Sequence, residues 1–102
     1  MNPSLDLTAA QHEQITALLT HHLPGVEVWA FGSRVKHTAR PNSDLDLVAF
    51  AEADHASRVA DLREAFEDSA LPFRVDLHVW RDLPESFQRN IAAEYTVLQH
   101  GR

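Results

Sequence analysis

The 102-residue sequence contains no cysteine. This absence excludes a disulfide scaffold, a zinc site built on thiolates, and catalysis by a thiol. Long hydrophobic runs are absent as well, because the longest apolar stretches span about five residues and a membrane helix needs about 20. The N-terminus has no basic segment followed by an apolar run. We therefore predict no signal peptide, no membrane association and a cytoplasmic location.

Basic residues are scarce: nine Lys and Arg stand against 15 Asp and Glu, for a formal net charge of −6. Because an acidic surface repels phosphate backbones, we expect no direct binding of nucleic acid. Apolar residues make up 44% of the chain and charged residues 24%, which is the balance of a soluble globular protein. A chain of this length is typical of one domain, and we predict a single domain over residues 1–102.

Hydrophobic patterning predicts an α+β fold in which a small sheet is covered by helices on one side. Thr8 and Gln11 fit a capping box at the start of the first helix, which ends at Pro24-Gly25. Strands are predicted over residues 26–31, 45–50, 73–80 and 95–98, and further helices after the caps Asp54 and Asp82. The other face of the sheet carries carboxylates, so we expect it to be open to solvent or to a ligand.

Two acids open the second predicted strand, in the run Asp44-Leu45-Asp46-Leu47. Side chains two residues apart on a strand point the same way, so Asp44 and Asp46 share a face with Cα atoms about 6.6 Å apart. Two such carboxylates repel each other unless a cation lies between them. A divalent ion with oxygen ligands resolves the repulsion. The alternative is that both are solvated edge residues.

A third acid, Asp76, lies in the middle of the cleanly alternating strand 73–80. If that strand lies beside the second one, three carboxylates converge, and such a group can hold two Mg²⁺ ions about 3.5–4 Å apart for in-line phosphoryl displacement. The alternative for Asp76 is a salt bridge to Arg74. His78 shares the face of Asp76; we interpret it as a solvated strand histidine, with tuning of the acidic site as the alternative.

A candidate phosphate site, Gly32-Ser33-Arg34, follows the first predicted strand. Glycine lets the backbone approach a phosphate closely, and Ser33 adds a hydroxyl donor. Arg34 can neutralise phosphate oxygens. This turn shortly precedes the acid pair, so one end of the site can hold the phosphates of a nucleotide while the other binds metal.

Residues 31–33 (Phe-Gly-Ser), a polar spacer and residues 44–47 (Asp-Leu-Asp-Leu) resemble the signature of the DNA polymerase beta-like nucleotidyltransferases. The longer segment 31–47 and the ending 87–98 are similar to the minimal nucleotidyltransferases, called MNT. The resemblance implies a polymerase beta palm-like fold, a small mixed β-sheet flanked by helices. It also implies transfer of AMP from ATP, a nucleoside triphosphate, with two Mg²⁺ ions as cofactors.

By this resemblance, Asp44, Asp46 and Asp76 are the catalytic and metal-ligating residues, and Asp76 also helps to deprotonate the acceptor hydroxyl. Gly32, Ser33 and Arg34 contact the triphosphate.

Many MNT proteins are encoded beside HEPN-domain ribonuclease toxins, act as their antitoxins, and attach AMP to a tyrosine of the toxin. The resemblance therefore implies a HEPN-type partner in a hetero-oligomer, with a dimer of this chain as the alternative. A second hypothesis is a catalytically silent antitoxin that masks its partner by contact. An adenylyltransferase for antibiotics is disfavoured, because the sequence shows no extra helical domain to bind such an acceptor.

Overall fold

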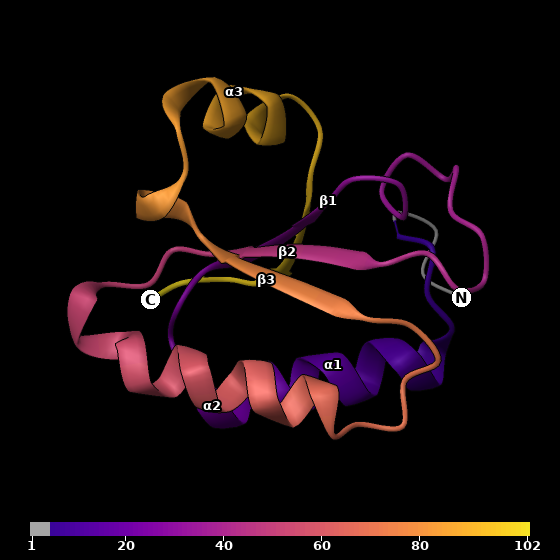
Figure 1. Ribbon diagram of the computed structural model, residues 1–102, viewed down its shortest axis with the longest axis horizontal. Helices are drawn as coiled ribbons and strands as arrows, with labels where there is room; N and C mark the ends of the chain where they lie inside the picture. The colour runs from indigo at the N-terminus through magenta and orange to yellow at the C-terminus, as the bar shows by residue number, and fades with distance from the viewer. Residues whose placement is uncertain (1–4) are drawn as a thin grey trace.

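The computed structural model describes residues 5–102, which form a four-stranded mixed sheet and three α-helices (Figure 1). Along the chain the elements are α1 (Ala9–His22), β1 (Val28–Phe31), β2 (Leu45–Ala49), α2 (Ala56–Glu67), β3 (Val75–Val79), α3 (Glu85–Ala93) and β4 (Thr96–Gln99). The predicted α+β class is confirmed. Among these helices, none combines the length and the hydrophobicity that crossing a bilayer requires.

The strands lie in the order β3-β2-β1-β4. β1 pairs antiparallel with both β2 and β4, whereas β2 and β3 are parallel. A parallel pair needs a long crossover connection, and α2 provides it. The register of this pair places Asp46 directly beside Asp76 and Val48 beside His78.

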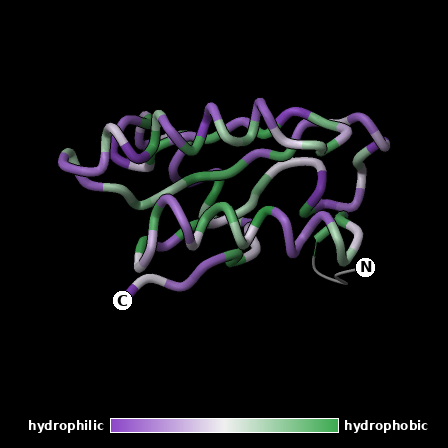
Figure 2. Tube along the Cα trace, turned by 90° about the horizontal axis from the view of Figure 1, so that it is seen from below, coloured by the Kyte–Doolittle hydropathy of each residue, from purple (hydrophilic) through white to green (hydrophobic). Residues whose placement is uncertain are grey.

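The main hydrophobic core lies between the sheet and the helices α1 and α2, which cover the same face (Figure 1). Figure 2, seen from the helical side, shows these two helices next to each other, with hydrophobic and hydrophilic residues alternating along each. Their buried residues follow helical spacing. The core includes Ile15, Leu19, Leu45, Leu47, Val59, Leu62 and Leu77.

The capping box at the start of α1 is confirmed: the N–H of Gln11 donates to Thr8 Oγ1 at 3.1 Å, and the N–H of Thr8 donates to Gln11 Oε1 at 3.0 Å. The predicted starts of the other two helices are wrong. Asp54 lies in a 3₁₀ turn, Ala53–His55, that precedes α2, and Asp82 ends another, Trp80–Asp82, before α3. Each short turn redirects the chain from a strand before the α-helix begins.

The expectation that all helices cover one face is also wrong, because α3 lies on the opposite side of the sheet (Figure 1). The α3 residue Phe87 contacts this face, with its ring centroid 5.9 Å from that of Phe31. The rings of Trp29, Phe50, Trp80 and Tyr95 form a connected aromatic cluster, in which Trp29 stacks on Tyr95 with ring centroids 3.8 Å apart. These rings cover part of this face at one end of the sheet, where the first three are half-buried and Tyr95 stays exposed.

Arg34 is only 5% exposed, which corrects the prediction that it contacts phosphate. Its Nε and Nη2 donate to the Ser43 carbonyl at 3.1 and 2.8 Å, and Nη1 donates to the Asp6 carbonyl at 2.7 Å. Nη2 also donates to the Pro41 carbonyl at 3.1 Å, and the guanidinium lies 4.0 Å from the Phe73 ring centroid. Arg34 therefore holds the connection between β1 and β2 against the N-terminal segment and the start of β3.

We predict that Arg34→Lys lowers the free energy of unfolding by about 2–4 kcal/mol, because one ammonium group cannot satisfy carbonyls on both sides of a buried guanidinium. Urea denaturation measures the loss. Arg58→Lys, on the exposed face of α2, is the matched control and should change stability by less than about 0.5 kcal/mol. A loss no larger than that of the control would contradict the structural role of Arg34.

Candidate active site

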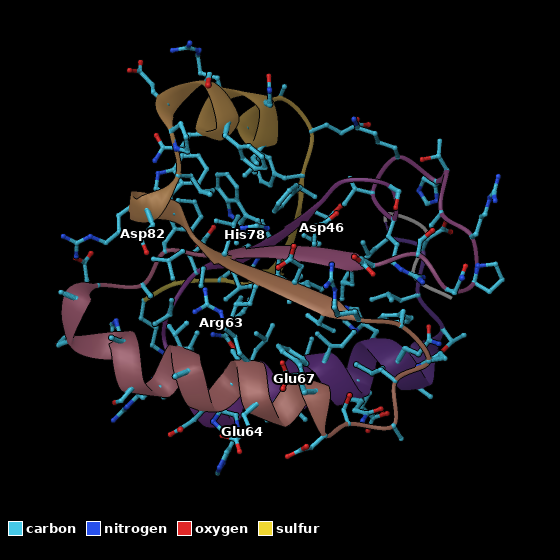
Figure 3. The ribbon with its side chains drawn as sticks, viewed as in Figure 1. Asp46, Arg63, Glu64, Glu67, His78 and Asp82 are labelled. Carbon is cyan, nitrogen blue, oxygen red and sulfur yellow. The ribbon has the colours of Figure 1, made fainter. Side chains whose placement is uncertain are left out.

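Asp46 and Asp76 lie side by side on the sheet face that α3 partly covers. Their strands are parallel and in register, so neighbouring positions carry their side chains to the same face. Figure 3 shows Asp46 and His78 on this side of the sheet, whereas Arg63 lies on the side of α2. The convergence of these two predicted site residues follows directly from the strand pairing.

The pairing is electrostatically unfavourable for Asp46. Burial raises the pKa of Asp46, the neighbouring carboxylate of Asp76 raises it further, and His78 and Arg74 act in the opposite direction. A buried carboxylate beside a second one favours either a proton or a cation. The site is therefore one that a divalent ion would stabilise.

Asp44, the third predicted acid, is held differently. It precedes β2, and its Oδ2 accepts a hydrogen bond from Arg74 Nη2 at 2.8 Å. Arg74 thus pairs with Asp44 and not with Asp76, the alternative that the sequence left open. Ligand atoms of Asp46, Asp76 and His78 lie within 4.8 Å of one another, and this group does not include Asp44.

His78 joins the two acids, although sequence reasoning favoured a solvated role for it. Its Nε2 lies 3.4 Å from Asp76 Oδ2, and its side chain is 29% exposed. Its ring centroid lies 5.8 Å from that of Phe31 and 6.1 Å from that of Phe87. Its two-residue spacing from Asp76 in an alternating strand is the sequence signal that could have placed His78 at the site. Its aromatic neighbours come from β1 and α3, and no local pattern in the sequence predicts those contacts.

Gly32 brings the predicted phosphate turn against Asp46. Its φ is +84°, and a Cβ at this position would lie 2.5 Å from Asp46 Oδ2. Its carbonyl accepts hydrogen bonds from the N–H groups of Val35 and Lys36, both at 3.1 Å, so a single helical turn starts here. Gly32 is therefore required both for the left-handed backbone and for the space that the carboxylate occupies.

A pocket of about 200 Å³ opens beside the same turn, between it and α3. Its lining includes Gly32, the exposed Lys36, Asn90 of α3 and Glu94, which directly follows α3. Ser33 lies in the turn itself, where its carbonyl accepts a hydrogen bond from the N–H of Thr38 at 3.0 Å. The pocket thus combines polar and basic groups with the apolar side chains of Phe31, Phe87 and Ile91, and Gly32 connects it to the carboxylate of Asp46.

The residues that converge here fit a divalent cation. Two carboxylates and an imidazole supply oxygen and nitrogen donors, and the carboxylate repulsion is relieved when a cation binds. Asp44, two residues before Asp46, lies outside this group and pairs with Arg74.

Paired carboxylates on adjoining strands, beside a glycine turn that follows an antiparallel strand, define a metal-dependent nucleotidyltransferase as the class of protein. Residues 13–100 match the family described as Polymerase beta, Nucleotidyltransferase. The chain belongs to this family, and the family resemblance noted in the sequence is confirmed.

Similar proteins indicate which kind of nucleotidyltransferase this chain resembles. The chain is 41% identical over 96 residues to a Haemophilus influenzae protein named "Probable protein adenylyltransferase MntA", with 93% of this chain and 84% of that protein aligned. A solved structure described as a minimal nucleotidyltransferase is 32% identical, with a TM-score of 0.66, and the alignment covers 85% of this chain and 88% of that one.

Two solved toxin–antitoxin complexes share the fold. One, crystallised with AMP-PNP, contains a chain of 22% identity with a TM-score of 0.68, and the alignment covers 89% of this chain and 74% of that one. The other is a tri-AMPylated Shewanella oneidensis HEPN toxin with its MNT antitoxin, at 17% identity and a TM-score of 0.53, covering 87% and 69% of the two chains.

We predict that Gly32→Ala weakens the binding of Mn²⁺ about tenfold, because the new methyl group displaces the Asp46 carboxylate. Gly25→Ala is the matched control: its φ is +77°, but its Cβ would meet only the flexible Arg102 side chain, at 3.6 Å. Both variants should lose about 1–3 kcal/mol of stability from backbone strain. Isothermal titration calorimetry separates them, and equal Mn²⁺ affinities would contradict the contact.

We predict that Asp46→Asn makes the metal-free protein more stable at pH 7. The pKa of Asp46 is raised in the folded state, so its ionised form opposes folding above that pKa, and the penalty disappears once the group is protonated. The stability difference between variant and wild type should therefore shrink as the pH falls towards about 4. Urea denaturation in EDTA measures it. Asp61→Asn, exposed on α2, should show no comparable gain at pH 7.

Proposed function

We propose that this protein transfers AMP from ATP to a tyrosine hydroxyl of a partner HEPN toxin, and so acts as the antitoxin of that toxin. The observation that carries the proposal is the register of β2 with β3, which sets Asp46 beside Asp76 and next to the Gly32 turn. Nucleotidyl transfer needs a phosphate-binding site directly beside a metal site, and this arrangement places the Gly32 turn next to the two carboxylates.

The acceptor is proposed from the relatives. The Haemophilus influenzae protein is named as a protein adenylyltransferase, and the MNT antitoxin of similar fold accompanies an AMPylated HEPN toxin. The face around the site also suits a protein acceptor, because Phe87, whose ring lies near His78, is 39% exposed, and Tyr95 on the same side of the sheet is 41% exposed. Exposed large apolar side chains beside a polar site are typical of a protein interface.

In the proposed reaction, the hydroxyl oxygen of the acceptor attacks the α-phosphorus of ATP, a new P–O bond forms, and the bond to the leaving pyrophosphate breaks. Asp76 accepts the hydroxyl proton, and the turn at Gly32 and Ser33 binds the phosphates through its N–H groups and hydroxyl. Two bound Mg²⁺ ions would neutralise the charge that develops on the phosphate and on both oxygens. Asp44, Asp46 and Asp76 would hold these ions, with Asp44 giving up Arg74.

We predict that Asp46→Asn and Asp76→Asn each lower AMP transfer by at least about 10²–10³-fold, because each removes a charge that stabilises the transition state. The assay incubates this protein, ATP, Mg²⁺ and the HEPN protein encoded beside it, and reads the intact mass of the HEPN protein for added AMP. Asp61→Asn is the control and should transfer AMP at the wild-type rate.

The same variants separate catalysis from masking. If AMP transfer is how the toxin is neutralised, both Asn variants lose neutralisation in a ribonuclease assay while they still bind the toxin. Neutralisation that survives in both variants, without any mass shift in the wild-type reaction, would overturn the proposal and leave a binding antitoxin.

A further inference from the structure

We propose that His78 is a direct ligand of the catalytic cation, and that Asp46, Asp76 and His78 form a mixed carboxylate–imidazole site that favours Mn²⁺ over Mg²⁺. The inference rests on the proposed function, since it concerns the cation of the same site. It extends the predicted set of three acids by a nitrogen donor from β3.

Geometry supports this assignment. One ligand atom from each of the three residues lies within 4.8 Å of the other two, and His78 Nε2 is 3.4 Å from Asp76 Oδ2. Atoms that ligate the same cation at about 2.0–2.2 Å lie about 3–4 Å apart around it, so only a small adjustment brings all three into one coordination shell. Within residues 5–102, no other three acidic or histidine side chains bring their ligand atoms this close together, within 4.8 Å of one another.

The surroundings of His78 distinguish it from His37, another histidine that lies close to an aspartate. His37 Nδ1 lies 3.3 Å from Asp6 Oδ1, but that imidazole is 48% exposed, and in the described part of the chain no third ligand accompanies the pair. His78 is less exposed, and the rings of Phe31 and Phe87 lie near its imidazole. Packing restricts the ring, so less side-chain entropy is lost when it binds a cation.

The donor set determines which cation is favoured. Mg²⁺ prefers oxygen ligands and keeps much of its water, so an imidazole suits it less well than it suits a divalent transition metal, of which Mn²⁺ is the one that also prefers carboxylates. Asp44, which would make the site richer in oxygen, is paired with Arg74 at 2.8 Å. The three remaining donors therefore favour a cation such as Mn²⁺, which accepts both carboxylate and imidazole.

Pulsed electron paramagnetic resonance of the full chain with one equivalent of Mn²⁺ tests the assignment. The experiment omits nucleotide, so that every nitrogen near the metal belongs to the protein. We expect electron spin-echo modulation from a directly bound ¹⁴N nucleus in the wild type, and its replacement by the ¹⁵N pattern when histidine is supplied as ¹⁵N-histidine.

His78→Gln should abolish the nitrogen modulation and weaken Mn²⁺ binding about tenfold, with a smaller change for Mg²⁺. His37→Gln is the matched control and should keep both the modulation and the affinity. Circular dichroism verifies that both variants are folded, and His78→Asn replaces His78→Gln if the latter is not.

Two results would overturn the inference, and AMP transfer measured with the same preparations identifies which hypothesis fails. Mn²⁺ that binds without nitrogen modulation, in an enzyme that transfers AMP, excludes His78 as a ligand and leaves the proposed function intact. A wild-type protein that neither binds Mn²⁺ nor transfers AMP contradicts the proposed function together with the inference.

Discussion

The parallel pairing of β2 with β3 is the constraint on which the site depends. Because the two strands are in register, Asp46 and Asp76 occupy adjacent positions on the same face, and their repulsion contributes to the raised pKa of Asp46. A hydrophobic pair in these positions would remove that repulsion and suit the sheet better. The arrangement is unfavourable for the empty protein and favourable once a cation binds, which is the expected property of a metal site.

The stability that this carboxylate pair lacks is supplied elsewhere in the fold. On the face opposite the carboxylates, α1 and α2 enclose the main core, and on the carboxylate face the aromatic rings around Trp29 pack against one another. Arg34 fixes the β1–β2 connection from within, through carbonyls on both sides of it. The Gly32 turn can therefore sit against Asp46 without relying on contacts made by the carboxylates themselves.

Sequence reasoning predicted the features that have local signatures. Period-two alternation identified β3 and the shared face of Asp76 and His78, and the capping box at Thr8 located the start of α1. What it missed depends on how distant segments pack. The direction of the Arg34 side chain depends on the path of a loop, and no spacing rule distinguishes a guanidinium that binds phosphate from one that binds carbonyls of its own chain.

The pairing of Asp44 with Arg74 was missed for the same reason, because it joins residues 30 positions apart across two strand ends. This pairing also decides whether Asp44 is available as a metal ligand. An acid already engaged by an arginine must exchange that partner before it can ligate a metal, whereas Asp46, Asp76 and His78 converge in the protein without any ligand. The pairing of β2 with β3 therefore brings Asp46, Asp76 and His78 together, whereas Asp44 could join them only by exchanging Arg74.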